Sequence, residues 1–246
     1  MADPYLSVVI PAYNEERRLP PTLRKLCAAL PALGKPYEII VVDDGSKDAT
    51  VQKVQELARG CPEIKLVSDG VNRGRTLAMR RGFAEARGEL ILETDSDGSV
   101  AEEAVIRFAR AFEADPKLDA IFGSRELPES KIVVWQPPHR VFLGYGFLYL
   151  ARFMLWMWDI TDFALGFKMF RREAARDIFA HQYERHIVAE AEILYISRAR
   201  GHRFKELPVV WTDDADSRIR PLREVFRSLA GLVRIRARAL AGTYRD

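Results

Sequence analysis

Residues 37–46 read YEIIVVDDGS, an apolar run of strand length that ends in four turn-forming residues. Similar runs occur in the first half of the chain, at residues 6–11, 64–67, 90–93 and 118–122. Their hydrophobic residues are continuous rather than alternating, which predicts strands buried on both faces of a mostly parallel sheet. Helical spacing and strong helix formers occupy the stretches between them, residues 22–33, 49–59, 76–87 and 101–114. This alternation predicts βαβ units and an α/β fold, with helices flanking the sheet.

The composition is that of an ordinary globular domain. The chain has 246 residues, 48% hydrophobic and 30% charged, which excludes disordered, collagen-like and coiled-coil proteins. The net charge is only +3, so bulk attraction to nucleic acid is not expected. No basic region followed by an apolar run and a cleavage site opens the chain, so no signal peptide is expected. Cys27 and Cys61 have neither metal-ligand nor redox spacing and are too few for a secreted disulfide framework, which predicts a reducing cytosol.

The most apolar window of the chain is VFLGYGFLYLARFMLWMWDI, residues 141–160. Its length would suffice for a membrane span, but Arg152 near its middle disfavours insertion by roughly 2.5–3.5 kcal/mol. Seven aromatic residues and two glycines suit the headgroup boundary better than lipid tails. We expect a helix or broken helix in the membrane interface, and a core helix or a true span are the alternatives.

Apolar and basic residues both recur at helical spacing in the tail, residues 221–241. The apolar residues are Leu222, Val225, Phe226, Leu229 and Val233, and the basic residues are Arg223, Arg227, Arg234 and Arg238. An apolar stripe beside an arginine stripe is typical of a helix on an anionic membrane surface. The alternative is the solvated face of a helix that packs against the domain.

Polar residues directly after the predicted strands are candidates for a site, because parallel α/β sheets bind ligands beyond the carboxyl ends of their strands. Asp95 and Asp97 follow one run, and two carboxylates would suit Mg²⁺ or Mn²⁺ bridging a diphosphate. Asp44 follows another and could accept a hydrogen bond from a nucleobase or ribose. For all three residues, the alternative is a role in the turn itself.

A basic loop, Asn72-Arg73-Gly74-Arg75, precedes a predicted helix. The free N–H groups and the dipole at a helix N-terminus favour phosphate, although a helix entry with exposed arginines is an equal alternative. No G-x-G-x-x-G segment follows the first strand and no P-loop is present, which argues against dinucleotide binding and ATPase activity.

Taken together and in order, these segments resemble family 2 glycosyltransferases, and more narrowly their polyprenyl-phosphate branch of dolichyl-phosphate glucosyltransferases and dolichol-phosphate mannose synthases. The segments are VVIPAYNEE, VVDDGSKDAT, NRGRTLAMRRGF, ETDSDG, FGSRE, TDFALGFKMFRREA, EAEILYISRARGHRFKELPVVWT and DSRIRP. They extend from about Leu6 into the arginine-rich tail. The resemblance implies one GT-A domain, with a nucleotide-sugar-binding half at residues 1–125 and an acceptor-binding half at residues 126–246.

The resemblance also implies roles for individual residues. The metal would be held by Asp95 and Asp97, and the lipid phosphate would be received by Arg125 and Arg140. Arg218 matches a basic residue in a loop that closes over the diphosphate of the donor. The donor site as a whole would comprise Pro11, Ala12, Tyr13, Glu15, Asp44, Asn72, Arg73, Gly74, Arg75, Asp95, Ser96, Asp97 and Arg218. Asp162, Glu190 and Glu192 match family carboxylates, of which we expect at least one near the reaction centre, with helix capping or arginine pairing as the alternative.

The implied chemistry is transfer of a hexose from a nucleotide sugar to a polyprenyl phosphate. A phosphate monoester has a second pKa near 6 and needs no strong base, so Arg125 and Arg140 would position it. The metal and Arg218 would neutralise the departing diphosphate, and in-line attack would give a β-linked product. We expect a peripheral enzyme at the cytoplasmic face of a membrane.

Departures from the family pattern bear on the donor. Ser99 stands where the mannosyl branch often has a glutamine at the metal site, and Phe163-Ala164-Leu165 replaces the more usual polar residues. The strings Gly166-Phe167-Lys168 and Val210-Trp211-Thr212 resemble the glucosyl branch, so UDP-glucose or another UDP-hexose is the expected donor. The alternatives are GDP-mannose as the donor, a soluble hydroxyl acceptor, and a non-catalytic nucleotide-sugar-binding membrane protein.

Overall fold

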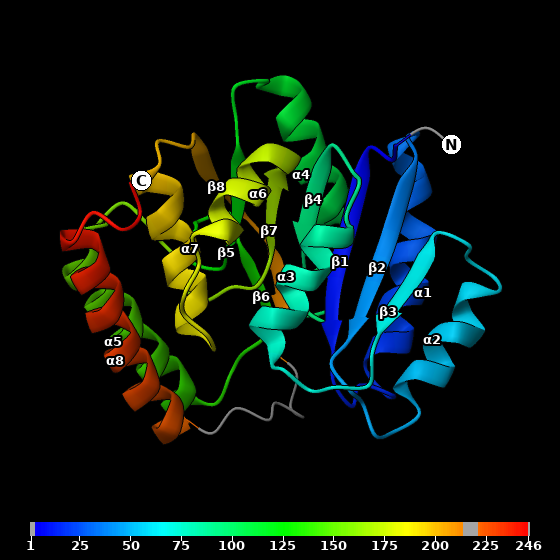
Figure 1. Ribbon diagram of the computed structural model, residues 1–246, viewed down its shortest axis with the longest axis horizontal. Helices are drawn as coiled ribbons and strands as arrows, with labels where there is room; N and C mark the ends of the chain where they lie inside the picture. The colour runs from blue at the N-terminus through cyan, green and yellow to red at the C-terminus, as the bar shows by residue number, and fades with distance from the viewer. Residues whose placement is uncertain (1–2, 214–220, 246) are drawn as a thin grey trace.

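The computed structural model describes residues 3–213 and 221–245, and within these ranges the chain folds around one large sheet (Figure 1). The sheet has seven strands, in the spatial order β3 (Ile64–Ser68), β2 (Tyr37–Asp43), β1 (Leu6–Ala12), β4 (Leu90–Glu93), β7 (Lys168–Arg171), β5 (Ala120–Ser124) and β8 (Phe204–Pro208). Strand β7 runs antiparallel to β4 and β5, and the other pairs are parallel. The predicted α/β fold with a mostly parallel sheet is therefore confirmed.

Helices cover both faces of the sheet because its central strands are apolar on both faces. Neighbouring side chains of a strand point to opposite faces, so Val9 of β1 joins one core while Val8 and Ile10 join the other. The core of Val9 is covered by α3 (Arg75–Glu85), α5 (Pro138–Leu155), α6 (Arg172–Ala180), α7 (Val188–Ala199) and α8 (Pro221–Leu240). The core of Val8 is covered by α1 (Leu19–Ala29), the short 3-10 helix η1 (Leu30–Leu33), α2 (Thr50–Ala58) and α4 (Glu103–Ala114).

Differences between predicted and observed boundaries have local causes. The helix expected over residues 22–33 is divided after Ala29 into α1 and η1, because Pro31 lacks an amide hydrogen and cannot donate the next helical hydrogen bond. The strand expected at residues 118–122 begins only at Ala120, because the amide of Leu118 closes a turn onto the carbonyl of Asp115 (3.1 Å). A small parallel sheet of β6 (Lys131–Val134) and β9 (Val210–Thr212) was not predicted.

The apolar window at residues 141–160 forms most of α5 and the turn after it. The helix ends at Leu155, where Trp156 adopts a left-handed conformation (φ 58°). One face of α5 is buried through Leu148, Ala151 and Leu155. The other faces expose large aromatic side chains, among them Phe142, Tyr145, Tyr149 and Phe153. Within the described ranges, no helix combines the length and the apolar character that crossing a membrane requires.

Helix α8 lies beside α5 at one edge of the molecule (Figure 1). Among its described side chains, from Phe226 onward, Ser228, Leu232 and Ile235 are buried. Its Gly231 comes so close to Val188 of α7 that an added Cβ would lie 2.5 Å from a valine methyl. Of the predicted apolar stripe, Phe226, Leu229 and Val233 are exposed, whereas the side chains of Leu222 and Val225 lie outside the described ones. Two of the predicted arginines, Arg234 and Arg238, bind the buried carboxylate of Glu184 instead of forming a solvated stripe.

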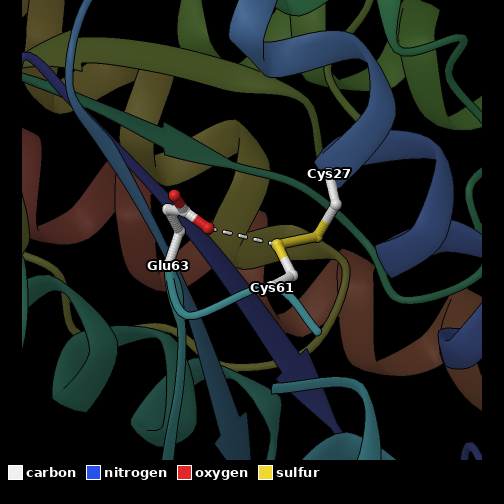
Figure 2. Close-up of a disulfide and its surroundings, with 3 residues drawn as sticks. All are labelled: Cys27, Cys61 and Glu63. Atoms are coloured by element: carbon white, nitrogen blue, oxygen red, sulfur yellow. Dashed lines mark hydrogen bonds between the residues drawn. A yellow bond between two sulfur atoms is a disulfide. The ribbon is translucent and has the colours of Figure 1, made fainter. Parts of the chain in front are cut away.

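The structure joins Cys27 and Cys61 in a disulfide (Figure 2). The sulfur of Cys61 also lies 3.5 Å from a carboxylate oxygen of Glu63. The two cysteines are 34 residues apart in the chain, but Cys27 near the end of α1 lies next to the turn between α2 and β3. This bond was not predicted from the sequence, because the pairing depends on how α1 and α2 pack and not on a local spacing.

Candidate active site

Most of the predicted site residues converge on a cavity of about 720 Å³ beyond the carboxyl ends of β1, β2 and β4. This volume lies in the range of small-molecule and cofactor sites. The predicted residues that line the cavity are Pro11, Ala12, Tyr13, Glu15, Asp44, Asn72, Gly74, Arg75, Asp95, Ser96, Asp97, Arg125, Arg140 and Glu190. Among the other predicted residues, Arg73, Asp162 and Glu192 do not line the cavity, and Arg218 lies outside the described residues.

Asp44 joins the end of β2 to the basic loop before α3. Its two carboxylate oxygens accept the backbone N–H groups of Arg73 (2.7 Å) and Gly74 (2.9 Å). The neighbouring Asp43 accepts the N–H of Ser46 (3.1 Å) and so supports the turn after the strand. Asp44 therefore lines the cavity and also holds the basic loop against it. The side chain of Arg73 pairs with Asp69 (2.5 Å), which accounts for its absence from the cavity wall.

Arg75 connects three carboxylates at the floor of the cavity. Its Nη2 donates to Asp95 (2.8 Å) and to Glu93 (2.9 Å), and its Nη1 donates to Glu190 (2.6 Å). Glu190 is bound on its other oxygen by the buried ammonium of Lys168. Two cations thus partly neutralise three acidic side chains, and the network holds Asp95 and Arg75 in defined positions.

The glycine of the segment Gly166-Phe167-Lys168 is required by this network. A Cβ at Gly166 would lie 2.6 Å from Nη2 of Arg75 and 2.7 Å from Oδ2 of Asp95. Contacts that short force the neighbouring atoms to move. A side chain at position 166 would therefore displace the end of the Arg75 or the Asp95 side chain beneath the cavity.

Burial and neighbouring charges shift the pKa values of the acidic side chains in this network in different directions. Burial and the neighbouring charge of Glu190 raise the pKa of Glu93 to about 7, against the opposing charges of Arg75 and Lys168. One oxygen of Glu93 is buried without a hydrogen-bond partner in the described part of the chain. Burial also raises the pKa of Asp95, although Arg75 opposes the shift. For Glu190, burial alone would raise the pKa, but Lys168 and Arg75 hold it below its usual value.

Asp95 and Asp97 have the chemistry of a magnesium or manganese site. Both line the cavity, and one oxygen of Asp97 accepts the backbone N–H of Ser99 (3.0 Å), which orients that carboxylate. No group of three or more His, Cys, Asp or Glu side chains is arranged for a metal among residues 3–213 and 221–245. Two hard carboxylate ligands completed by phosphate oxygens are the usual way to hold Mg²⁺, so the residues present fit a metal that arrives with a diphosphate.

The two arginines expected to bind the acceptor phosphate both line the cavity beside a carboxylate. Arg125 makes a two-point contact with Asp162, at 2.7 and 3.0 Å, and its guanidinium lies 5.3 Å from the centre of the Trp211 ring. Arg140 lies 3.6 Å from Asp213. Burial alone would raise the pKa of Asp162, but Arg125 keeps it below its usual value. Asp162 is therefore an ionised partner that orients Arg125.

Glu190 and Glu192 do not share a role. A helix turns about 100° per residue, so side chains two positions apart on α7 point in nearly opposite directions. Glu190 lines the cavity, whereas Glu192 is fully buried and accepts the backbone N–H groups of Tyr183 (2.9 Å) and Glu184 (2.6 Å). Its second oxygen accepts the hydroxyl of Tyr244 (2.6 Å). Of the three carboxylates of which at least one was expected near the reaction centre, Glu190 lines the cavity and Glu192 does not, and the contacts of Glu192 hold the loop before α7.

Several cavity residues were missed by sequence reasoning. They are Arg18, Ser99, Gln136, Ala164, Leu165, Gly166, His186, Ile187, Trp211, Asp213 and Arg227. The sequence was compared with the family pattern at Ser99, residues 163–168 and Trp211, but these residues were not predicted to line the site. Their position after a strand or near a candidate carboxylate could have indicated it. His186 and Arg227 belong to no such motif. The left-handed backbone of His186 (φ 64°), which few non-glycine residues adopt, is visible only in the structure.

Comparison with known proteins places this site in a family. The model of the family described as Glycosyl transferase family 2 matches residues 7–179. A dolichyl-phosphate beta-glucosyltransferase of Trichomonas vaginalis is 36% identical over 88% of this chain and 66% of the relative. The human dolichyl-phosphate beta-glucosyltransferase is 34% identical over 98% of this chain and 77% of the relative. The chain thus spans about two thirds to three quarters of the length of these relatives.

Solved structures of lower sequence identity share the fold. A mannosyltransferase from Pyrobaculum calidifontis, in complex with GDP-Man and Mn²⁺, has a TM-score of 0.64 and 21% identity, over 98% of this chain and 65% of its own. Glucosyl-3-phosphoglycerate synthase from Mycobacterium tuberculosis, in complex with Mn²⁺, UDP and glucosyl-3-phosphoglycerate, has a TM-score of 0.66 and 18% identity, over 95% of this chain and 80% of its own. The expected GT-A architecture is confirmed by these neighbours.

Proposed function

The chain belongs to glycosyltransferase family 2, and we propose that it transfers glucose from UDP-glucose to a polyprenyl phosphate such as dolichyl phosphate. The names of the similar glucosyltransferases support the sugar and the dolichyl acceptor. The solved neighbour with UDP supports a uridine nucleotide. The product would carry the sugar in β linkage.

One observation carries this proposal. A single cavity is lined by the paired carboxylates Asp95 and Asp97 and by the arginines Arg125 and Arg140. Transfer to a lipid phosphate brings two anions together, the diphosphate of the donor and the phosphate of the acceptor. Carboxylates suit the first through a divalent cation, and guanidinium groups suit the second directly. The presence of both kinds of group in one cavity supports a separate site for each anion.

The residues of the cavity favour positioning over general-base catalysis. A phosphate acceptor is already largely a dianion at neutral pH, so its attack on the sugar needs no proton removal. Arg125, oriented by Asp162, would hold the acceptor phosphate in line with the anomeric carbon of the donor. Glu190 is bound by Arg75 and Lys168, which suits a residue that fixes the cavity floor.

The donor would be held from the opposite side. Asp95 and Asp97 would hold Mg²⁺ or Mn²⁺, which when bound neutralises charge on the departing diphosphate. The basic loop at residues 72–75, fixed by Asp44, would approach the donor phosphates at the N-terminus of α3. Arg218 remains a proposed contact to the diphosphate from a segment outside the described residues.

We further propose that the protein works at the cytoplasmic face of a membrane through the outer faces of α5 and α8. These two helices lie side by side and expose aromatic and aliphatic side chains, including Tyr149, Phe153, Phe226 and Val233. Exposed apolar groups on adjacent helices match a surface that enters the headgroup region. An acceptor with a membrane-bound tail would thereby meet the cavity without leaving the bilayer.

The function is tested by a transfer assay with a short polyprenyl phosphate and Mg²⁺ or Mn²⁺. UDP-glucose, UDP-N-acetylglucosamine and GDP-mannose are offered in parallel, with Asp97→Asn beside the wild type. The control is Glu173→Gln, which changes an exposed carboxylate of α6. We expect a lipid-linked product from UDP-glucose in the wild type and the control, and at least a hundredfold loss in Asp97→Asn.

Other outcomes of this assay identify the alternatives. Product only from GDP-mannose would reassign the donor. Donor hydrolysis without a lipid product would indicate a soluble hydroxyl acceptor, and nucleotide binding without any turnover would indicate a non-catalytic binding protein.

A further inference from the structure

A second, smaller cavity adjoins the large one. Its volume is about 80 Å³, and it lies between α5 and the segments that carry Phe163 and Trp211. Arg125, Gln136, Ala164 and Trp211 line both cavities, so the small one opens off the large one next to the proposed acceptor arginine. A volume of 80 Å³ cannot hold a nucleotide sugar, but it can hold a short apolar group.

Most of the surface of the small cavity is apolar, although Glu126, Thr161 and Asp162 also line it. Val141, Gly144 and Leu148 face it from α5, and their spacing of three and four residues places them on one side of the helix. Ile132, Phe163 and Trp211 contribute apolar surface from other segments. On the rim, the hydroxyl of Tyr145 donates to a carboxylate oxygen of Glu126 (2.9 Å), which ties α5 to the segment after β5.

The charged end of the small cavity is at Arg125. Asp162 accepts two hydrogen bonds from this guanidinium, which also lies over the ring of Trp211. The small cavity thus combines a cation held in place by Asp162 with largely apolar walls. A matching ligand has an anionic head and, directly attached to it, a short apolar segment.

We infer that this cavity, here called the α5 groove, binds the first isoprene unit of the acceptor, the five-carbon unit that carries the phosphate. The inference rests on the proposed transfer to a polyprenyl phosphate. It identifies the part of the lipid chain that the protein recognises. The groove is too small for more than the beginning of the chain, so the remaining units would pass onto the exposed aromatic face of α5.

Two glycines of α5 allow a matched test. A Cβ added at Gly144 or at Gly146 meets no atom within 4 Å, so both positions accept a side chain without a clash. Gly144 lines the groove, whereas Gly146 does not. Leucine favours a helix over glycine to the same extent at either position, so Gly144→Leu and Gly146→Leu should have similar melting temperatures. Only the first places its side chain in the groove.

The experiment uses citronellyl phosphate, a soluble two-unit isoprenoid phosphate, as the acceptor and UDP-glucose as the donor. We expect Gly144→Leu to raise the KM for citronellyl phosphate at least tenfold and Gly146→Leu to change it less than twofold. The KM for UDP-glucose should stay within twofold of wild type in both variants. Gly144→Ala, a smaller change, should give an intermediate KM for the acceptor.

Three results would overturn the inference. Equal acceptor KM values in Gly144→Leu and Gly146→Leu would show that the groove does not contact the acceptor. A raised KM for UDP-glucose in Gly144→Leu alone would assign the groove to the sugar of the donor. If the wild type transfers glucose to no isoprenoid phosphate, the proposed function is wrong and the assignment of the groove is wrong with it. This result can be told apart from the other two because it requires only the wild type.

Discussion

The carboxylate of Asp162 holds the guanidinium of Arg125 at two points, with Nε 2.7 Å from Oδ2 and Nη2 3.0 Å from Oδ1. A two-point contact fixes the plane of the guanidinium as well as its position. The same arginine lines both the large cavity and the α5 groove. In the proposed reaction, this pair would determine where an anionic acceptor lies relative to the donor.

Asp162→Asn keeps the shape of the side chain and removes its charge. A hydrogen bond to a charged group contributes about 1.5–3 kcal/mol, so we expect the kcat/KM for a polyprenyl phosphate to fall on the order of 10- to 100-fold. Donor KM should not change. The control is Asp159→Asn, which removes an exposed partner of Arg198 nearby in the chain. If instead the variant loses the acidic limb of the kcat profile against pH, Asp162 acts as a general base.

Gly166→Ala should disturb the floor of the cavity. The added Cβ would lie 2.6 Å from Arg75 and 2.7 Å from Asp95, so one of these groups must move. Overpacking of this kind costs about 1–3 kcal/mol of stability, and the displaced Asp95 should weaken binding of the donor with its metal. The measurements are urea unfolding and calorimetric titration of UDP with Mn²⁺. Gly60→Ala, where the added Cβ makes only an ordinary contact at 3.8 Å, is the control, and equal UDP affinity in the two variants would contradict the argument.

Glu93 should make the protein less stable as the pH rises toward neutrality. Burial and the charge of Glu190 raise the pKa of Glu93 from 4.5 to about 7 in the folded chain. A carboxyl with a raised folded-state pKa stabilises the protein fully below its unfolded pKa and loses that contribution as the pH rises through 7. The loss is on the order of 3 kcal/mol. Urea unfolding at pH 5 and pH 8 should show it in the wild type and not in Glu93→Gln, and the same pH difference in both proteins would refute the assignment.

The disulfide should contribute substantially to stability. Cross-linking two residues 34 positions apart restricts the unfolded chain and stabilises the fold by about 4 kcal/mol in the chain-entropy model. Reductant should therefore lower the urea midpoint of the wild type. The double variant Cys27→Ala/Cys61→Ala should unfold at the lower midpoint whether or not reductant is present. An unchanged wild-type midpoint in reductant would mean that the bond adds nothing to stability.

Membrane association should depend on the outer faces of α5 and α8. Phe153 and Phe226 are 63% and 73% exposed, and burying such a side chain fully contributes about 1.5–3 kcal/mol. We expect Phe153→Ser and Phe226→Ser each to reduce binding to vesicles with anionic lipids about tenfold in a flotation assay. Val71→Ser removes an exposed apolar residue from the loop before α3 and should have no effect. Equal loss in all three variants would show that the two helices have no special role.

Much of the fold and of the site was available from the sequence, because both depend on short segments. Strands β1 to β4 were predicted within a residue at each end, since continuous apolar runs bounded by turns report burial on both faces directly. The motifs after these strands lie together because parallel strands bring their carboxyl ends to one edge of a sheet. Asp95, Asp97, Arg125 and Arg140 therefore line one cavity as the family resemblance implied.

Tertiary packing decided the features that no local pattern could determine. Helical periodicity in the tail was detected, but which face is buried depends on what packs against it. Gly231 of α8 lies against Val188 of α7 and Leu232 joins the core, whereas Phe226, Leu229 and Val233 of the predicted stripe are exposed. Glu190 and Glu192 both resembled site residues, and the orientation of α7 admits only Glu190. The pairing of Cys27 with Cys61 likewise follows from the approach of two elements that are distant in the chain. The sequence determines which segments form strands and carry charge because those properties are local, whereas the structure determines which side chains meet because contacts between distant segments depend on the whole fold.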